Sequence, residues 1–236
     1  MPKGTLYLIP VPLADNVAAK SFTPYLIETI NQIGEYIVEN EKTARRFLKE
    51  AGLTTPQSQL VIHDYGKHNR ESGLGQFFTG LEAGKPVGLM SEAGCPGIAD
   101  PGADIVAEAH KRGIKVIPLV GPSSVLLALM ASGFNGQSFT FHGYLPIDKQ
   151  HRAKRIKELE SQAERFNQTQ LFIETPFRNN QMLEEILRTC NAKTRLCIAC
   201  NITAADEMVK TQSIADWKKQ VPDLHKKPTI FLLFRS

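Results

Sequence analysis

The sequence contains no apolar stretch long enough to cross a membrane. Its longest clean apolar run, Val125–Ala131, falls far short of the roughly 20 residues that a spanning helix needs. No basic segment followed by a long apolar stretch opens the chain, so we do not expect a signal peptide. These absences predict a soluble protein with no membrane partner.

Cysteine is scarce, and its spacing favours neither a redox pair nor a zinc site. Of the four cysteines, Cys197 and Cys200 have the spacing of such sites. They belong, however, to a strand-like segment, Arg195–Cys200, in which residues three apart point to opposite faces. A redox pair normally opens a helix, and structural zinc needs four ligands. We therefore predict reduced thiols packed in the core, a cytoplasmic location and no metal site.

Strong charge and the common phosphate-binding motifs are also absent. The formal net charge of +4 permits a nucleic-acid partner without arguing for one. No strand is followed by G-x-G-x-x-G, and no G-x-x-x-x-G-K-[ST] occurs. Both absences disfavour dinucleotide and P-loop triphosphate sites.

What the sequence does contain is a regular alternation of strand and helix patterns. With 236 residues, 42% of them hydrophobic, the chain can build one or two cores. Residues 1–119 predict an α/β domain with a mostly parallel sheet. Residues 120–236 are less regular and predict a second α/β domain with a mixed sheet. The fold class is thus α/β, with two domains.

Two loops rich in glycine and proline follow neighbouring predicted strands. Ser91–Gly102 comes after the apolar run Val87–Met90, and Gly121–Ser124 follows the next strand and opens a helix. Glycine lets a ligand approach the backbone closely, and open α/β sheets bind ligands at the carboxyl ends of their strands. One such loop is compatible with a simple tight turn, but two at adjacent strand ends favour a ligand cleft.

These loops, with three further segments, carry a resemblance to the tetrapyrrole methylase superfamily of S-adenosylmethionine-dependent methyltransferases. Within it the chain resembles the branch that methylates a ribose 2′-hydroxyl of small-subunit (16S) ribosomal RNA. The segments occur in the same order along nearly the whole chain: Thr5–Pro12, Ser91–Gly102, Gly121–Ser124, Phe141–Pro146 and Glu174–Arg178. The resemblance implies two α/β domains with the cofactor cleft between them, usually in a homodimer, and ribosomal RNA or its particle as partner.

The resemblance also implies which residues line the cofactor. They are mostly small or apolar, which suits a methyl donor that needs alignment more than acid–base assistance. The implied cofactor-binding residues are Leu13, Glu92, Gly94, Cys95, Ser123, Ser124, Ile173, Ala199 and Pro228.

The acceptor side departs from the pattern of the RNA branch. Where that branch has an acidic residue followed by Asp-Thr-Arg, this chain reads Glu39-Asn40-Glu41-Lys42, and Cys200–Ala204 replaces Arg-Glu-Leu-Thr-Lys. A ribose hydroxyl benefits from a base or a stabilising cation. The remaining catalytic candidates, each of which could equally be a surface ion pair, are Glu39, Lys42, Glu174, Arg178 and Glu207.

The departures leave other functions open. One is a methylase of a tetrapyrrole-like or other small acceptor, and another is a catalytically degenerate, cofactor-binding RNA-associated protein. The basic segment Lys149–Lys157 is the best candidate for phosphate contact, although the charged face of an amphipathic helix is the plainer explanation of it.

Overall fold

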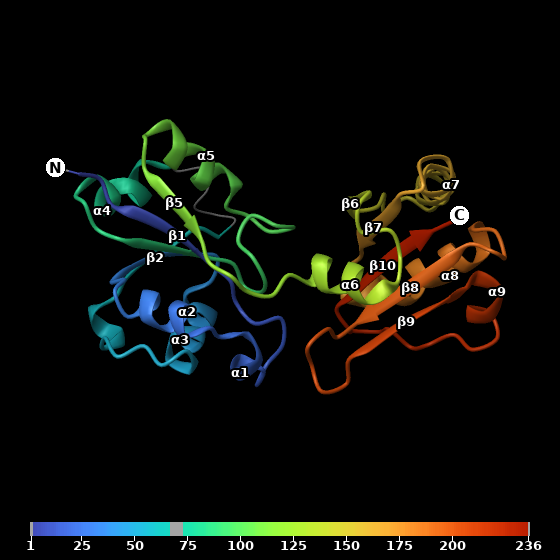
Figure 1. Ribbon diagram of the computed structural model, residues 1–236, viewed down its shortest axis with the longest axis horizontal. Helices are drawn as coiled ribbons and strands as arrows, with labels where there is room; N and C mark the ends of the chain where they lie inside the picture. The colour runs from blue at the N-terminus through green and yellow to red at the C-terminus, as the bar shows by residue number, and fades with distance from the viewer. Residues whose placement is uncertain (1, 67–72, 236) are drawn as a thin grey trace. The chain divides into compact units, whose positions relative to one another are not determined.

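The computed structural model describes residues 2–66 and 73–235, and it divides into two compact units, Met1–Ser123 and Ser124–Ser236. Figure 1 shows the elements of each unit. No helix in the described part of the chain combines the length and the apolar character that a bilayer crossing requires.

The N-terminal unit is built on a five-stranded parallel sheet. The strands are β1 (Thr5–Ile9), β2 (Glu35–Val38), β3 (Val61–Asp64), β4 (Val87–Met90) and β5 (Lys115–Pro118). They lie in the order β3-β2-β4-β1-β5, which places β4 and β1 at the centre. The α-helices among the described residues are α1 (Ala18–Ser21), α2 (Pro24–Ile30), α3 (Glu41–Glu50), α4 (Thr79–Glu82) and α5 (Ala103–Lys111), and the short 3₁₀ helices described there are η1 (Gln57–Gln59) and η3 (Gly75–Phe78).

Helices cover both faces of this sheet, which is the reason its strands are almost continuously apolar. On one face α2 and α3 pack Leu26 and Phe47 against Ile9 of β1. On the other, η3 and α5 pack Phe78 and Ile105 in the cluster that contains Leu6 of the same strand. Side chains alternate between the faces of a strand, so β1 supplies both cores.

The C-terminal unit has a mixed five-stranded sheet. Its strands are β6 (Phe139–Tyr144), β7 (Thr169–Ile173), β8 (Arg195–Cys200), β9 (Met208–Ser213) and β10 (Thr229–Phe234). In the order β6-β7-β10-β8-β9, the first pair is parallel and the other three are antiparallel. The helices are α6 (Ser124–Ser132), α7 (Lys149–Phe166), α8 (Asn179–Thr189) and α9 (Ile214–Trp217), with the 3₁₀ helix η4 (Pro176–Arg178).

One face of this second sheet is buried under α7, α8 and α9. Ile156 of α7, Ile186 of α8 and Trp217 of α9 join one core with Phe172 and Phe231. The indole N–H of Trp217 donates to the Leu196 carbonyl at 2.9 Å, so its polar atom is satisfied inside the core. Helix α6 packs against β8, β9 and β10.

The α/β class, the parallel first sheet and the mixed second sheet agree with the sequence prediction. The sequence did not indicate α1, β9 or α9. Strand β9 has the polar sequence MVKTQS and lies at the sheet edge, so it carries little hydrophobic pattern and is held by its pairing with β8.

We predict that Gly88→Ala destabilises the N-terminal unit by about 1–3 kcal/mol through overpacking. A Cβ atom at Gly88 would lie 2.7 Å from Ile9 Cδ1 and 2.7 Å from Tyr36 Cδ1, both in the buried centre of the sheet. The matched control is Gly34→Ala, where an added Cβ meets no atom within 4 Å. Thermal unfolding of both variants checks this, and equal melting temperatures would contradict the packing described.

Candidate functional site

The connections of the N-terminal sheet reverse direction between the neighbouring strands β1 and β4. These strands are neighbours, yet the chain leaves β1 towards β2 and leaves β4 towards β5, in opposite directions across the sheet. The connecting helices consequently lie on opposite faces of the sheet. Open α/β sheets bind ligands at such a point.

Two loops are joined directly to each other at the carboxyl ends of β1 and β4. The N–H of Val11 donates to the Gly94 carbonyl at 2.9 Å, and the N–H of Gly94 donates to the Val11 carbonyl at 2.8 Å. Gly94 has a φ of +75°, which L side chains rarely adopt. A Cβ atom there would lie 3.3 Å from Leu13 Cδ2. The structure therefore brings together Leu13 and Gly94, two of the residues predicted to bind the cofactor.

The Ser91–Gly102 loop has an unusually constrained backbone. Gly94, Gly97 and Gly102 have positive φ angles, and so does Ala99 at +63°. A non-glycine residue in this region costs about 1 kcal/mol or more, and such conformations cluster at functional sites. The glycines of this loop thus occupy three of the four positions at which its backbone has a positive φ.

The loop after β5 completes the same end of the sheet. Gly121 packs against Pro10, because a Cβ atom at Gly121 would lie 2.1 Å from Pro10 Cγ. The thiol of Cys95 donates to the Pro122 carbonyl at 3.3 Å, and burial raises the pKa of Cys95, so it remains a protonated thiol. Ser123 is buried, and Ser124 begins α6 in the other unit.

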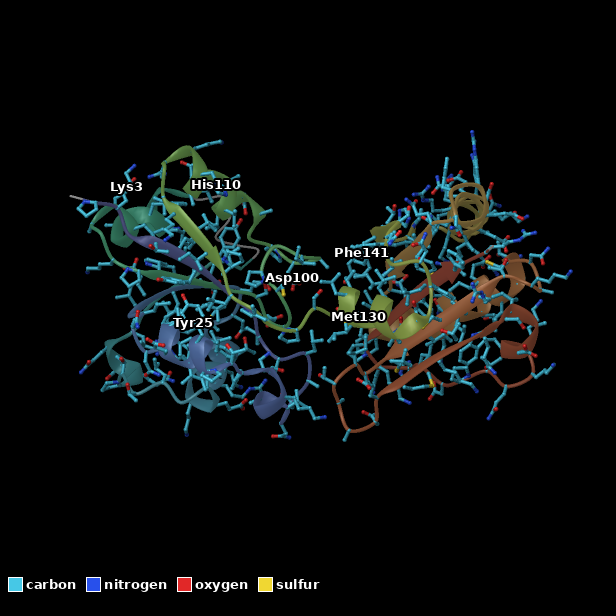
Figure 2. The ribbon with its side chains drawn as sticks, viewed as in Figure 1. Lys3, Tyr25, Asp100, His110, Met130 and Phe141 are labelled. Atoms are coloured by element: carbon cyan, nitrogen blue, oxygen red, sulfur yellow. The ribbon has the colours of Figure 1, made fainter. Side chains whose placement is uncertain are left out.

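Three carboxylates gather beside these loops. The Glu92 N–H donates to Glu39 Oε2 at 3.1 Å, which ties the end of β2 to the end of β4. Burial, together with the smaller effect of the negative charges of Glu39 and Glu92, raises the pKa of Asp100 to about 6. Figure 2 shows Asp100 at the opposite end of this unit from Lys3, which lies two residues before the first residue of β1. Asp100 was not among the predicted site residues, although it lies inside the loop that the sequence singled out.

In the C-terminal unit, two of the predicted adenosine-side residues share one sheet face. Ile173 of β7 and Ala199 of β8 are each opposite Ile230 of β10. They alternate with Phe172 and Ile198, which face the helical core, so they lie on the other side of the sheet. Pro228, exposed, directly precedes β10 at the same end of the sheet.

Glu174 and Arg178 form an ion pair with each other. Arg178 Nη2 donates to Glu174 Oε1 at 2.7 Å, and the Thr175 N–H donates to the same oxygen at 2.6 Å. The Glu174 side chain is only 1% exposed. This arrangement fixes the turn from β7 into α8 and suits a role in positioning rather than in proton transfer.

The other two catalytic candidates occupy different places. Glu207 accepts the Thr203 N–H at 2.5 Å and closes the loop after β8, where Asn201 and Thr203 have positive φ. The Asn201 N–H donates to the Pro228 carbonyl at 2.9 Å, and this bond joins the loop to the residue that precedes β10. Lys42 is exposed in the first turn of α3, three residues after Glu39.

One residue of the basic helix α7, Arg152, is buried, although the sequence predicted a surface position for it. Arg152, in the segment predicted to contact phosphate from the surface, is 8% exposed and donates through Nη1 to the Ile147 carbonyl at 2.9 Å. It is therefore a buried residue, because α7 turns that position towards α8. Lys154 and Lys157 on the same helix are exposed.

Within residues 2–66 and 73–235, no group of three or more histidine, cysteine or acidic side chains could hold a metal ion. None of the four cysteines forms a disulfide. Cys197 and Cys200 are buried on opposite faces of β8, as the strand interpretation predicted, and burial raises the pKa of each.

We predict that Asp100→Asn stabilises the protein at neutral pH. The folded-state pKa of about 6 lies above the ordinary value of 3.8, so folding disfavours the ionised carboxylate. The contribution of the Asp100 carboxyl to the free energy of unfolding is complete below about pH 4 and is lost as pH rises towards 6. The partly solvated side chain reduces the effect to about 1 kcal/mol.

Melting temperatures of the parent and of Asp100→Asn at about pH 4 and about pH 7.5 check this prediction. The variant should melt higher only at the upper pH. A variant that is equally or less stable at both values would show that the carboxylate is not crowded by its acidic neighbours.

Comparisons with known proteins place this geometry in a family. A family model described as Tetrapyrrole (Corrin/Porphyrin) Methylases matches residues 14–217. Ribosomal RNA small subunit methyltransferase I of Halalkalibacterium halodurans is 32% identical over 185 residues, 78% of this chain and 60% of that protein. The protein of the same name from Synechocystis sp. is 30% identical over 204 residues, 86% of this chain and 69% of that protein. The one from Vibrio cholerae is 27% identical over 218 residues, 92% and 72% respectively.

A solved structure shows the same fold. The crystal structure of the methyltransferase CobJ matches with a TM-score of 0.64 and 17% sequence identity, covering 99% of this chain and 95% of that one. The family match, the relatives and the fold agree. The chain belongs to the tetrapyrrole methylase family, in the branch of the ribosomal RNA small subunit methyltransferase I proteins.

Proposed function

We propose that this protein transfers a methyl group from S-adenosylmethionine to a ribose 2′-hydroxyl of small-subunit (16S) ribosomal RNA. The observation that carries the proposal is the Val11–Gly94 pairing of the loops after β1 and β4, in a chain whose relatives bear the name of a ribosomal RNA methyltransferase. We further propose a cytoplasmic homodimer. The unlinked cysteines support a reducing compartment, and the dimer rests on the family resemblance.

The residues present at the N-terminal strand ends fit this cofactor. Ser91 Oγ is buried at the end of β4 and has no hydrogen-bond partner in the described part of the chain, so a polar ligand would satisfy it. Glu39, Glu92 and Asp100 repel one another there. A cationic sulfonium ligand would relieve that repulsion. The backbone of Gly94 leaves room for close approach.

When bound, the cofactor supplies a methyl group that its sulfonium already activates. The protein's own residues then have two tasks, which are to align the acceptor oxygen with that methyl group and to receive the hydroxyl proton. We assign alignment to the loops bearing Leu13, Gly94 and Cys95. We assign the receipt of the hydroxyl proton to the carboxylates of Glu39 and Asp100, because both side chains lie beside those loops.

The remaining predicted residues keep narrower roles in the proposal. Ile173, Ala199 and Pro228 offer an apolar surface for the adenosine, and two of them share a sheet face. The Glu174–Arg178 ion pair and the Glu207-capped loop shape the same end of the C-terminal sheet. Lys42 is free to approach an RNA phosphate because it is exposed.

One observation favours a second candidate, a cofactor-binding RNA-associated protein without turnover. The loop after β8 reads Asn201-Ile202-Thr203-Ala204 and lacks the charges of the RNA branch. In the structure its acidic neighbours Asp206 and Glu207 are engaged in hydrogen bonds that hold the loop itself. Only a measurement of methyl transfer separates this candidate from the enzyme.

We predict that Gly94→Val weakens binding of S-adenosylmethionine at least tenfold, while the parent binds one cofactor per chain. A branched side chain at a φ of +75° strains the loop and presses on Leu13. Titration calorimetry measures both affinities.

Gly113→Val is the matched control, because Gly113 also has a positive φ, +64°, but has no atom within 4 Å of an added Cβ. This control should lose stability and keep its cofactor affinity. Equal affinities in the parent and Gly94→Val would place the cofactor elsewhere, and an absence of heat or thermal shift at millimolar ligand would refute cofactor binding.

The acceptor is tested with labelled cofactor and small ribosomal subunits from cells that lack the protein. We predict that the label appears in the subunit RNA and is located on a ribose. We expect little transfer to naked RNA, because a protein with a net charge of +4 binds free RNA weakly. Transfer to a tetrapyrrole precursor would support the small-acceptor function. Tight cofactor binding without transfer to any acceptor would support the protein without turnover.

A further inference from the structure

A small pocket lies between α7 and α8, apart from the strand ends described above. It has a volume of about 170 Å³, enough for several water molecules or one phosphoryl group. Its lining is Lys149, Arg152, Gln181, Glu184, Glu185 and Arg188. Lys149 opens α7, and Gln181 lies in the first turn of α8, so the pocket begins at the amino ends of two helices.

The guanidinium of Arg152 is the unusual feature of this pocket. The residue is 8% exposed, yet within the described residues its side chain makes a single hydrogen bond, from Nη1 to the Ile147 carbonyl. Its Nε is buried with no partner there. Arginine has five N–H donors, and a buried cation with few hydrogen-bond acceptors is costly, even though Asp148 lies near enough for Arg152 to help lower the pKa of that carboxyl. The pocket beside it is the available place for an acceptor.

The electrostatics of the pocket favour an anion. Glu185 is already occupied, since its Oε1 accepts from Arg188 and, at 3.0 Å, from Thr189 Oγ1. Glu184 is exposed and solvated. The 3₁₀ helix η4 leads directly into α8, and no side chain caps the amino end of α8 in the described structure. Lys149 and Arg152 supply the full charges.

We propose that this pocket binds a phosphoryl group, with Arg152 and Lys149 as its cationic ligands. This inference rests on the proposed function for its source, a backbone phosphate of the RNA substrate. A free phosphate ion has the same chemistry and is separated in the test below. The basic helix thus contacts RNA through a pocket that it forms with α8, and Arg152 acts from a buried position.

Gln181→Glu is the sharpest variant. It places a carboxylate at the pocket mouth, at the third position of α8, where acidic residues stabilise a helix. The fold is therefore preserved while the pocket repels anions. Lys149→Gln removes one cation and serves as a second variant. The controls carry the same charge changes at exposed sites outside the lining and outside the basic helix, Gln220→Glu and Lys193→Gln.

The first readout is the melting temperature in inorganic phosphate against chloride at equal ionic strength. We expect phosphate to stabilise the parent and both controls, and to have little effect on Gln181→Glu and Lys149→Gln. No stabilisation of the parent, or equal stabilisation of all five proteins, would overturn the proposal. This readout needs neither cofactor nor RNA, so it stands even if the proposed function fails.

The second readout is affinity for small ribosomal subunits as a function of salt. Gln181→Glu and Lys149→Gln should bind about tenfold more weakly than their controls. The slope of log affinity against log salt should become shallower by about the amount that one phosphate contact contributes. The affinity for the cofactor should be unchanged. If phosphate stabilises the parent but subunit affinity equals that of the controls, the ligand is a free phosphate and the RNA source is refuted.

Discussion

The pairing of Val11 with Gly94 is the interaction on which the candidate site depends. Two reciprocal hydrogen bonds join the loops that leave the central strands β1 and β4 in opposite directions. The pairing requires Gly94 at a φ of +75°, and it places Leu13 against that glycine. Pro10, one residue earlier, in turn requires Gly121 to have no side chain. Three strand-end loops are thereby fixed by backbone geometry, and few side-chain functional groups are needed to hold them.

A site fixed mainly by its backbone suits the proposed methyl transfer. A methyl group on a sulfonium needs alignment more than a strong acid or base, so a rigid backbone cradle supplies most of what the donor side requires. Charge enters through Glu39, Glu92 and Asp100; burial, and then repulsion by the two glutamates, raises the pKa of Asp100 to about 6. The C-terminal unit uses its acids differently. Glu174 and Glu207 hold turns at the end of their own sheet through bonds to Arg178 and Thr203.

The sequence predicted the fold class and the glycine-rich loops at the strand ends because both leave local signals. Apolar strands covered on two faces read as continuous runs, and the left-handed turns of Ser91–Gly102 demand glycine. Strand β9 left no such signal, since its polar residues form an edge that β8 holds in place. Arg152 looked like a surface cation because burial depends on how α7 packs against α8. The crowding of Asp100 likewise depends on acids far apart in the sequence.

Hydrogen–deuterium exchange with and without S-adenosylhomocysteine tests the central claim most directly, because it reports on the strand-end backbone itself. The account predicts slower exchange in the 91–102 and 119–123 segments when the ligand is bound, with residues 41–50 of α3 unchanged as the internal reference. Protection confined to other segments, or no protection despite ligand saturation, would contradict the claim that these loops form the cofactor site.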